Sequence, residues 1–349
     1  MNGYTFKELT PGQRQTYQAA VELYQAYLAA RKECRTFRGG MHWKKIRGRD
    51  YLYRYRDRYG HGESLGHRSE DTERLFAGFT RKRREIISRV RRERLGLQEH
   101  TRYCRAARVH RLPLTTAKIM RRLEEHPLGA NLMVIGTAAI YAYEGAAGVF
   151  LDPGGSQNLL AASARRLTLA GAGETSWEEL LRLLRRTDRS FAPLPDTACR
   201  AANRDGFVVQ LVKSGLRRPG KQKTVTVPGA LAPLPPEAGN LQYFLASPKF
   251  SQVVIGRGGY PVTLAAPDPR AFALHKFWLS QQEDRAEATR RRDYHQALAV
   301  ADLVLRYLPQ YEYFSTELDM LPQDLVRSAS RFAEGADLAG EEDGYMEFD

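Results

Sequence analysis

Val134 to Leu160 reads VIGTAAIYAYEGAAGVFLDPGGSQNLL, and this segment sets the expected fold. An apolar, strand-like run ends in Gly136-Thr137, and a helical run from Ala138 to Ala147 follows it. A turn-rich passage from Asp152 to Ser156 then leads into a second short apolar run. A glycine turn between a strand and a helix N-terminus presents backbone N–H groups that bind phosphate. The segment therefore predicts an α/β core that begins at an anion-binding turn.

The composition is that of a folded chain with two domains, or one domain with large additions. The chain has 349 residues, of which 42% are hydrophobic and 10% aromatic, so a core can be buried. No apolar run approaches about 18 residues, and the N-terminus lacks a basic start followed by an apolar block. Cys34, Cys104 and Cys199 lie far apart and indicate neither disulfides nor a metal site. We expect a cytoplasmic protein without a membrane span.

Positive charge is concentrated in one part of the sequence. The net charge is +14, and Thr80 to Arg94 holds eight Lys and Arg residues but only two Glu. Gly335 to Asp349 carries six acidic residues and no basic one, which predicts a disordered acidic tail. Two interpretations of the charge stay open: a well-charged soluble surface, or a surface that binds nucleic acid.

The basic segment lies in a predicted long helix that starts near Ser69 and continues past Leu97. Its apolar residues form a broken stripe, and four arginines lie opposite them: Arg81, Arg84, Arg91 and Arg92. Charges of one sign repel each other along a helix unless an anion is bound. These arginines are therefore candidates for contact with the phosphates of RNA or DNA, and a solvated helix face is the alternative.

The segment from Phe37 to Tyr59 alternates with a period of two. Tyr51, Tyr53 and Tyr55 are separated by Leu52 and Arg54, which predicts a small β-hairpin with tyrosine on one face. Aromatic rings interleaved with cations can stack on bases and bind phosphates. The alternative is a hairpin that packs its tyrosines inward.

Periodicity and capping residues predict the remaining elements. Helices are expected at Thr10–Lys32, Leu114–Glu125, Ser176–Asp188, from Asp268-Pro269 onward, Thr289–Tyr307 and Leu321–Phe332. Strands are expected at Leu132–Ile135, Arg166–Leu169, Gly206–Val212 and in a hairpin over Val253–Leu264. We predict a basic helical region over 1–126, a core over 127–265, a helical domain over 266–334 and a tail over 335–349.

Several motifs in the same order resemble a bacterial family of polymerase-β-like nucleotidyltransferase-fold proteins. The resemblance rests on LTPGQ from Leu9, GGMHWKKIRGRDYLY from Gly39, IGTAAIYAYEGAAGV from Ile135 and VVIGRGGYPVTLAAPDPRAFALHKFWLSQ from Val253. It implies an α/β (α+β) fold, with a mixed nucleotidyltransferase-type sheet flanked by helices. It also implies NTP and Mg²⁺ as cofactors if the protein is active.

The resemblance assigns candidate nucleotide-binding positions. Gly136 and Thr137 match the family's phosphate turn. The C-terminal part resembles nucleotidyltransferases of bacterial toxin–antitoxin and abortive-infection systems, in which a Lys and an Arg-Asp pair flank the triphosphate. The matching residues are Lys276, Arg292 and Asp293. Lys276 alternatively pairs with Asp293 or Glu283, and we expect its neighbour His275 to serve in packing.

The catalytic positions depart from the family pattern. Nucleotidyl transfer uses two metal ions held by carboxylates, two of them at i and i+2 on one strand. Ser156 and Asn158 fall where the resemblance places that pair, and Gln210 falls near the third acidic position. Neutral side chains are poor Mg²⁺ ligands without anionic help. Glu144 and Asp152 lie nearby but do not restore the i, i+2 geometry.

Three functions stay open from the sequence. The first is a degenerate nucleotidyltransferase-fold protein, a natural pseudoenzyme or an inactivated variant, that binds nucleotide, nucleic acid or a protein partner. The second is an active Mg²⁺-dependent enzyme that moves an NMP from an NTP to RNA, DNA or protein. The third is a structural subunit of a complex. We assign no metal ligands, and the sequence leaves enzymatic activity undecided.

Overall fold

The computed structural model describes residues 4–37, 39–56, 61–151, 159–171, 175–195, 199–213, 249–283, 285–313 and 318. The chain divides into two compact units, one from Gln15 to Arg108 and one that combines the residues before and after it. The break after Arg108 precedes the segment that forms helix α3 (Leu114–Glu124). The predicted core and the helices that follow it therefore share one unit, called the core unit below.

A five-stranded mixed sheet forms the centre of the core unit. Its strands lie in the order β5 (Leu132–Ile135), β7 (Arg166–Gly171), β10 (Val208–Lys213), β9 (Arg200–Ala202) and β8 (Ala192–Pro193). Strand β7 pairs antiparallel with β5 and parallel with β10. The strand beside β5 in this sheet is thus β7, although β7 begins about thirty residues after the glycine turn along the chain.

The two faces of this sheet differ in composition. Alternate residues of a strand point to opposite faces, and Val134, Leu167, Leu169 and Val209 all join the main hydrophobic core. The other face carries a small separate cluster of Met133, Ile135, Ala170 and Val212. The second face thus has room for polar side chains between its few apolar ones.

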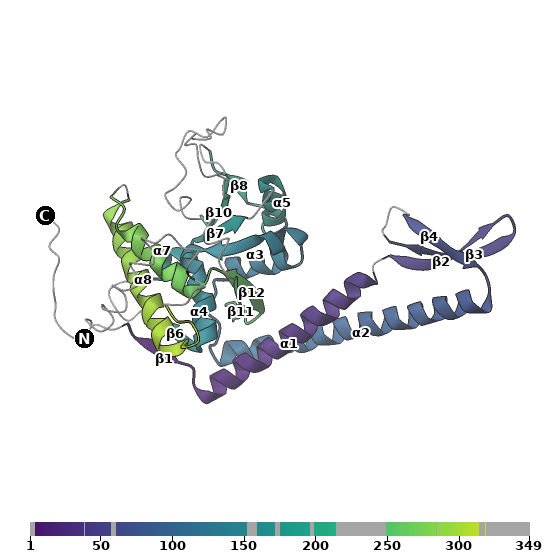
Figure 1. The fold of residues 1–349 in the computed structure, drawn as a ribbon, viewed down its shortest axis with the longest axis horizontal. Coiled ribbons are helices and arrows are strands. Elements are labelled where there is room, and N and C mark those ends of the chain that lie inside the picture. Colours follow the sequence, from purple (N-terminus) through teal and green to yellow (C-terminus); the bar gives the residue numbers. More distant parts are fainter. Residues whose placement is uncertain are drawn as a thin grey trace. The chain divides into compact units, whose positions relative to one another are not determined.

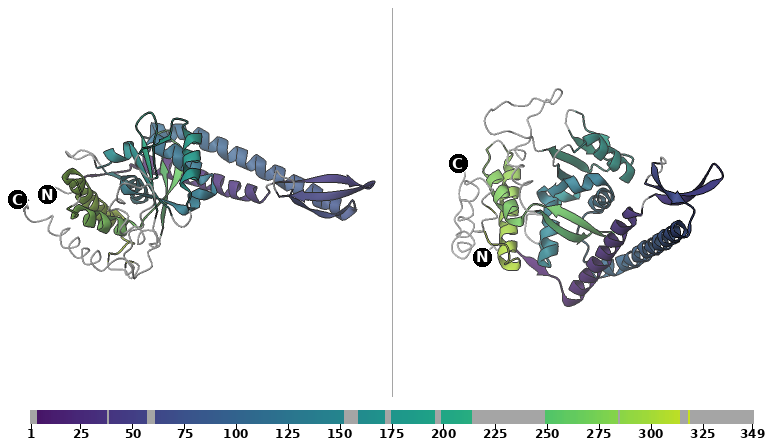
Figure 2. Two further views of the ribbon diagram at one scale, coloured as in Figure 1. Left: turned by 90° about the horizontal axis from the view of Figure 1, so that it is seen from above. Right: turned by 45° about the vertical axis from the view of Figure 1, so that its right-hand side comes forward.

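Helices and two small sheets complete the core unit (Figures 1 and 2). The sheets are β1 (Phe6–Glu8) with β6 (Val149–Leu151), and β11 (Phe250–Ile255) with β12 (Pro261–Ala266). Helices α4 (Ile140–Ala147), α5 (Trp177–Thr187), α7 (Pro269–Ser280) and α8 (Glu287–Tyr307) contribute side chains to the main core. Helices α7 and α8 pack closely along each other.

Glu144 is a structural residue of this core. Its buried carboxylate accepts hydrogen bonds from Arg111 Nη2 at 2.8 Å and from the backbone N–H of Leu151 at 2.7 Å. Burial raises the pKa of Glu144, and Arg111 opposes that rise. The residue therefore ties α4 to β6, as the sequence allowed.

The unit from Gln15 to Arg108 contains two long antiparallel helices and a three-stranded sheet (Figure 1). Helix α1 (Pro11–Thr36) enters it, and α2 (Glu70–Ala106) begins at Ser69, whose side chain caps the helix together with Thr72. Between them lie β2 (Gly40–Ile46), β3 (Arg49–Tyr55) and β4 (Gly62–His67), paired in that order. The predicted hairpin is present, and the structure adds β4 as its third strand.

The predicted fold class is confirmed as a mixed α+β architecture. The predicted strand Leu132–Ile135 matches β5, and the expected caps Asp268 and Ser176 begin α7 and α5. The helix expected from Ala138 begins as a short 3₁₀ turn, Gly136–Ala139, before α4. The predicted helix Leu321–Phe332 and the acidic tail lie outside the described residues. No helix in the described ranges has both the length and the apolar character needed to cross a membrane.

Candidate functional site

The glycine turn follows β5 directly. Gly136 has a φ of +68°, a left-handed conformation that is costly for residues with a Cβ. Thr137 follows it, and its Oγ1 accepts a hydrogen bond of 3.0 Å from Gln296 Nε2 of α8. Gln296 Nε2 also donates to the carbonyl of Leu159 at 2.7 Å, and the side chain is fully buried. The turn is therefore fixed by a helix that lies about 160 residues later in the chain.

Two buried cations share one carboxylate beside this turn. Asp293 of α8 is fully buried, and its Oδ1 and Oδ2 accept from Lys276 Nζ at 2.6 Å and from Arg285 Nη2 at 2.8 Å. Lys276 lies on α7, so this ion pair joins the two helices. Asp293 is therefore the shared carboxylate of two ion pairs.

Lys276 and Gly136 face the same small cavity. Its lining includes Ile135, Gly136, Lys276 and His275, and its volume is about 20 Å³. A cavity of that size holds roughly one water molecule, so a nucleotide does not fit inside it. A bound phosphate would therefore lie at the surface of the turn, with the Lys276 charge behind it.

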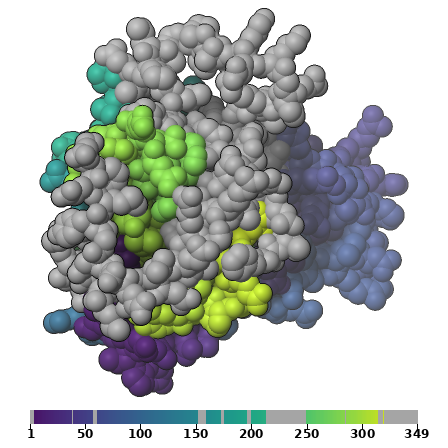
Figure 3. All heavy atoms as spheres, turned by 60° about the vertical axis from the view of Figure 1, so that its left-hand side comes forward, coloured from purple at the N-terminus to yellow at the C-terminus, as the bar shows by residue number. Residues whose placement is uncertain are grey.

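Arg292 adds a further cation on the same helix. Arg292 and Gln296 are four residues apart, so they lie on one side of α8 one turn from each other. The Arg292 side chain is half-buried, and its buried Nε has no hydrogen-bond partner among the described residues. Figure 3 shows a face of the core unit on which green to yellow-green residues, the colours of α7 and α8, reach the surface. The guanidinium of Arg292 is therefore less committed than Lys276 and Arg285, which both donate to Asp293.

Polar residues form a row across the second face of the sheet. The register pairs Ile135 with Thr168, Thr168 with Gln210, and Gln210 with Arg200. A Cβ built on Gly136 would lie 4.0 Å from Thr168 Oγ1, so this row starts at the turn. Arg166 precedes Thr168 by two residues on β7 and shares its face. Beside the turn, β7 therefore offers Arg166 and Thr168 at i and i+2.

A comparison of the sequence with protein families agrees with this geometry. The sequence model of a family described as nucleotidyltransferase matches residues 115–319, more than half of the chain. The chain belongs to this nucleotidyltransferase family. No curated protein matches the chain, and no solved structure does. The match covers the central sheet, the glycine turn and helices α7 and α8.

The structure describes some of the predicted site residues of this family member and not others. Gly136, Thr137, Lys276 and Asp293 lie around the turn, and Arg292 flanks them on α8. Gln210 lies in the polar row and is 5% exposed. Ser156 and Asn158 lie outside the described residues. The roles given to all of these residues stay predictions.

Sequence reasoning missed Thr168, Arg166 and Gln296. Thr168 and Arg166 were assigned to a strand without any role, because their position beside the turn depends on the pairing of β5 with β7. Gln296 lies four residues after Arg292 and three after Asp293, so the three share one side of a helix. That spacing could have identified Gln296 from the sequence.

Clusters of metal-binding side chains were sought among the described residues of this family member. No group of three or more His, Cys, Asp or Glu side chains within them is arranged to hold a metal ion. In the polar row, Thr168 and Gln210 offer neutral oxygens, while Arg166 and Arg200 bring positive charge. A row with this chemistry favours anions over divalent cations.

The basic face of α2 is a second candidate surface, in the other unit. Arg81, Arg84, Arg91 and Arg92 are all exposed, and Arg81, Arg84 and Arg91 make no ion pair with a described residue. Their spacing places Arg81, Arg84 and Arg91 on one stripe of the helix. This basic stripe contains three of the four predicted nucleic-acid residues, and the fourth, Arg92, pairs with Glu93.

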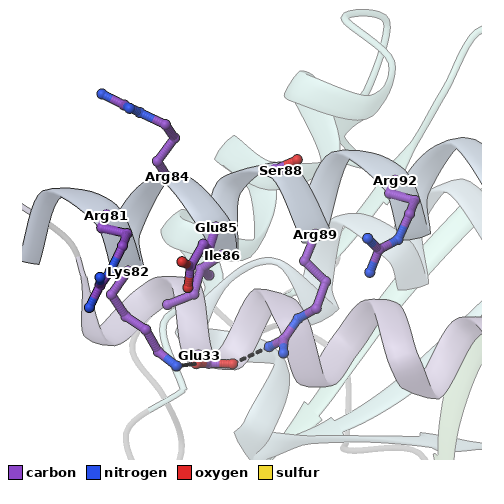
Figure 4. Close-up of a pocket in the computed structure, with 9 residues that line it drawn as sticks. All are labelled: Glu33, Arg81, Lys82, Arg84, Glu85, Ile86, Ser88, Arg89 and Arg92. Carbon is purple, nitrogen blue, oxygen red and sulfur yellow. Dashed lines mark hydrogen bonds and ion pairs between the residues drawn. The ribbon is translucent and has the colours of Figure 1, made fainter. Parts of the chain in front are cut away.

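A groove of about 600 Å³ borders the basic stripe between α2 and α1. Figure 4 shows Glu33 of α1 lying between Lys82 and Arg89, which both pair with it, while Arg84 extends away from the groove. The groove's other lining residues are Arg81, Arg84, Glu85, Ile86, Ser88 and Arg92. Lys82 and Arg89 therefore balance the charge of Glu33 inside the groove. Arg84 extends out of the groove and makes no ion pair with a described residue.

The position of His275 makes the stability of the core unit depend on pH. The ring is buried and stacks on Trp278 with centroids 5.9 Å apart. Burial holds the pKa of His275 well below its usual value, and the charges of Lys276 and Arg285 lower it further. The folded state therefore favours the neutral ring.

We predict that the free energy of unfolding falls as the pH drops below about 6.5, where the unfolded chain takes up a proton that the folded chain does not. The His275 contribution amounts to at most about 1.4 kcal/mol per pH unit. His275→Phe keeps a ring against Trp278 and should lose this part of the slope. Denaturant titrations at several pH values from about 5 to 7 measure it. Equal slopes for both proteins would contradict the prediction.

Proposed function

We propose that this nucleotidyltransferase-family chain binds a nucleotide at the Gly136 turn without holding the metal ions that nucleotidyl transfer requires. The observation that carries the proposal is the grouping of Gly136, Thr137 and Lys276 around one turn. Backbone N–H groups at such a turn bind phosphate oxygens, and a nearby ammonium group strengthens that binding. The Lys276 ammonium, which Asp293 holds beside this turn, supports the same assignment.

Arg292 is the proposed direct contact to the phosphates. Lys276 and Arg285 are already hydrogen-bonded to Asp293, so they act mainly through their charge. Arg292 has no such commitment among the described residues, and one turn of helix separates it from the residue that fixes Thr137. A guanidinium is suited to phosphate because its donors form a planar fork.

The described residues of the polar row do not fit Mg²⁺. Mg²⁺ prefers carboxylate oxygens in octahedral geometry, and the polar row presents Thr168 and Gln210 between arginines. The protein would act as a nucleotide-binding pseudoenzyme, and Mg²⁺ belongs to the alternative function alone.

Exchange of Arg292 for Ala should weaken nucleotide binding about tenfold or more, because a charge-assisted hydrogen bond contributes roughly 1.5–3 kcal/mol. Arg291→Ala is the matched control, since Arg291 is the neighbouring residue, is 70% exposed and pairs with Glu287. Isothermal titration calorimetry with ATP, GTP, CTP and UTP measures both variants. Equal affinities of the two variants, or no binding by the unsubstituted chain, would contradict the proposal.

The alternative is an active Mg²⁺-dependent enzyme that transfers an NMP to RNA, DNA or protein. Incubation of the unsubstituted chain with labelled NTPs, Mg²⁺ and bulk RNA discriminates the two. Robust incorporation would establish the alternative, whereas the proposal expects nucleotide binding without incorporation.

We further propose that the basic stripe of α2 binds the phosphate backbone of a nucleic acid. Arg81, Arg84 and Arg91 repel one another along one side of the helix, and a polyanion relieves that repulsion. Their exposure and their lack of ion pairs with described residues leave them available to a large partner. This surface belongs to the unit from Gln15 to Arg108 and is independent of the nucleotide proposal.

Arg84→Glu combined with Arg91→Glu should abolish nucleic-acid binding, and binding by the unsubstituted chain should weaken steeply as salt increases. Arg74→Glu combined with Arg102→Glu is the control. It changes the charge of the same helix equally, at arginines that already pair with Glu70, Asp71 and Glu99. Fluorescence anisotropy with labelled oligonucleotides measures both. Binding that does not depend on salt, or equal loss in both double variants, would refute the proposal.

A further inference from the structure

The small sheet β2–β3–β4 packs one of its faces on α2. Leu52 is fully buried, and its cross-strand partner Trp43 lies 5.8 Å from the ring of Phe76 of α2. The guanidinium of Arg54, on the same face, lies 5.4 Å from the centre of the Phe79 ring. This face is therefore the packed side of the sheet.

The tyrosines lie on the opposite face. Because side chains alternate along a strand, Tyr51, Tyr53 and Tyr55 point away from the side that holds Leu52 and Arg54. All three are partly exposed, and the rings of Tyr53 and Tyr55 lie nearly parallel, 25° apart with centroids at 6.2 Å. The structure thus favours the interpretation in which the tyrosines are not packed inward against α2.

Basic side chains accompany these rings. Lys44 and His42 are exposed on the neighbouring strand, directly opposite Tyr51 and Tyr53 in the register. The Lys44 ammonium lies 5.5 Å from the centre of the Tyr53 ring, and the His42 ring lies 5.8 Å from that of Tyr55. The turn between β2 and β3 adds Arg47 and the strand start Arg49. The face therefore combines flat aromatic surfaces with positive charge.

We infer that this tyrosine face is a platform for single-stranded nucleic acid, whose bases stack on Tyr51, Tyr53 and Tyr55 while its phosphates meet Lys44 and the basic turn. Stacking on aromatic side chains needs unpaired bases, because a duplex keeps the faces of its bases covered. Charge complementarity favours a polyanion over an apolar or cationic partner. The inference rests on the proposed nucleic-acid binding by α2 and adds that the bound strand is single.

Tyr53→Ala tests the platform, with the full chain and labelled oligonucleotides of about 15 nucleotides. We expect affinity for single-stranded RNA and DNA to fall about tenfold, since each stacked base contributes roughly 1–3 kcal/mol. Tyr53→Phe keeps the ring and should bind nearly as the unsubstituted chain does. Tyr103→Ala is the control, because Tyr103 is a tyrosine of α2 that is 59% exposed and lies outside the sheet. Affinity for a duplex of the same length should not change in any of these variants.

A second measurement covers the case in which Tyr53→Ala does not fold. Tyr53→Trp introduces a reporter ring, and single-stranded RNA should quench its added fluorescence, while the duplex should not. Absence of that quenching overturns the inference.

The outcomes also separate the platform from the basic stripe. If Arg84→Glu with Arg91→Glu loses binding while Tyr53→Ala binds single strands normally, the platform is refuted and the basic stripe stands. Preference of the unsubstituted chain for duplex refutes the platform as well. If the unsubstituted chain binds neither probe, the proposed nucleic-acid function fails together with the inference.

Discussion

The arrangement of the site depends on one buried carboxylate. Asp293 pairs with Lys276 and Arg285 in the protein interior, where breaking a buried ion pair costs about 3–5 kcal/mol. This constraint fixes α7 against α8. It thereby brings Gln296, three residues beyond Asp293, to the hydroxyl of Thr137. The glycine turn, its supporting helix and its cations are thus parts of one connected structure that residues far apart in the sequence build together.

Local signals in the sequence predicted the elements, and long-range pairing decided the site. Asp268 with Pro269 and Ser69 with Thr72 begin helices by contacts within a few residues, so these starts were readable. The pairing of Ile135 with Thr168 joins strands about thirty residues apart. No local rule chooses that partner, which is why Thr168 and Arg166 were missed as neighbours of the turn.

For several residues the sequence allowed two roles, and the structure describes their contacts. Lys276 pairs with Asp293, one of the two carboxylates that were expected as its partners. Beside the turn, Lys276 can therefore act on a phosphate through its charge. The period of two along β3 predicted that tyrosines share a face. It did not predict which face packs on α2, because Leu52 and Trp43 find Phe76 only through tertiary contact.

The proposed function joins nucleotide binding at the Gly136 turn to the lack of a metal-binding cluster among the described residues. The most direct measurement is a crystal structure with ATP and Mn²⁺, with the metal located by its anomalous scattering. We expect a triphosphate at the Gly136 turn with Arg292 as its ligand, and no Mn²⁺ held by the residues of β7 and β10. Mn²⁺ bound to protein carboxylates and to the triphosphate at that place would contradict it.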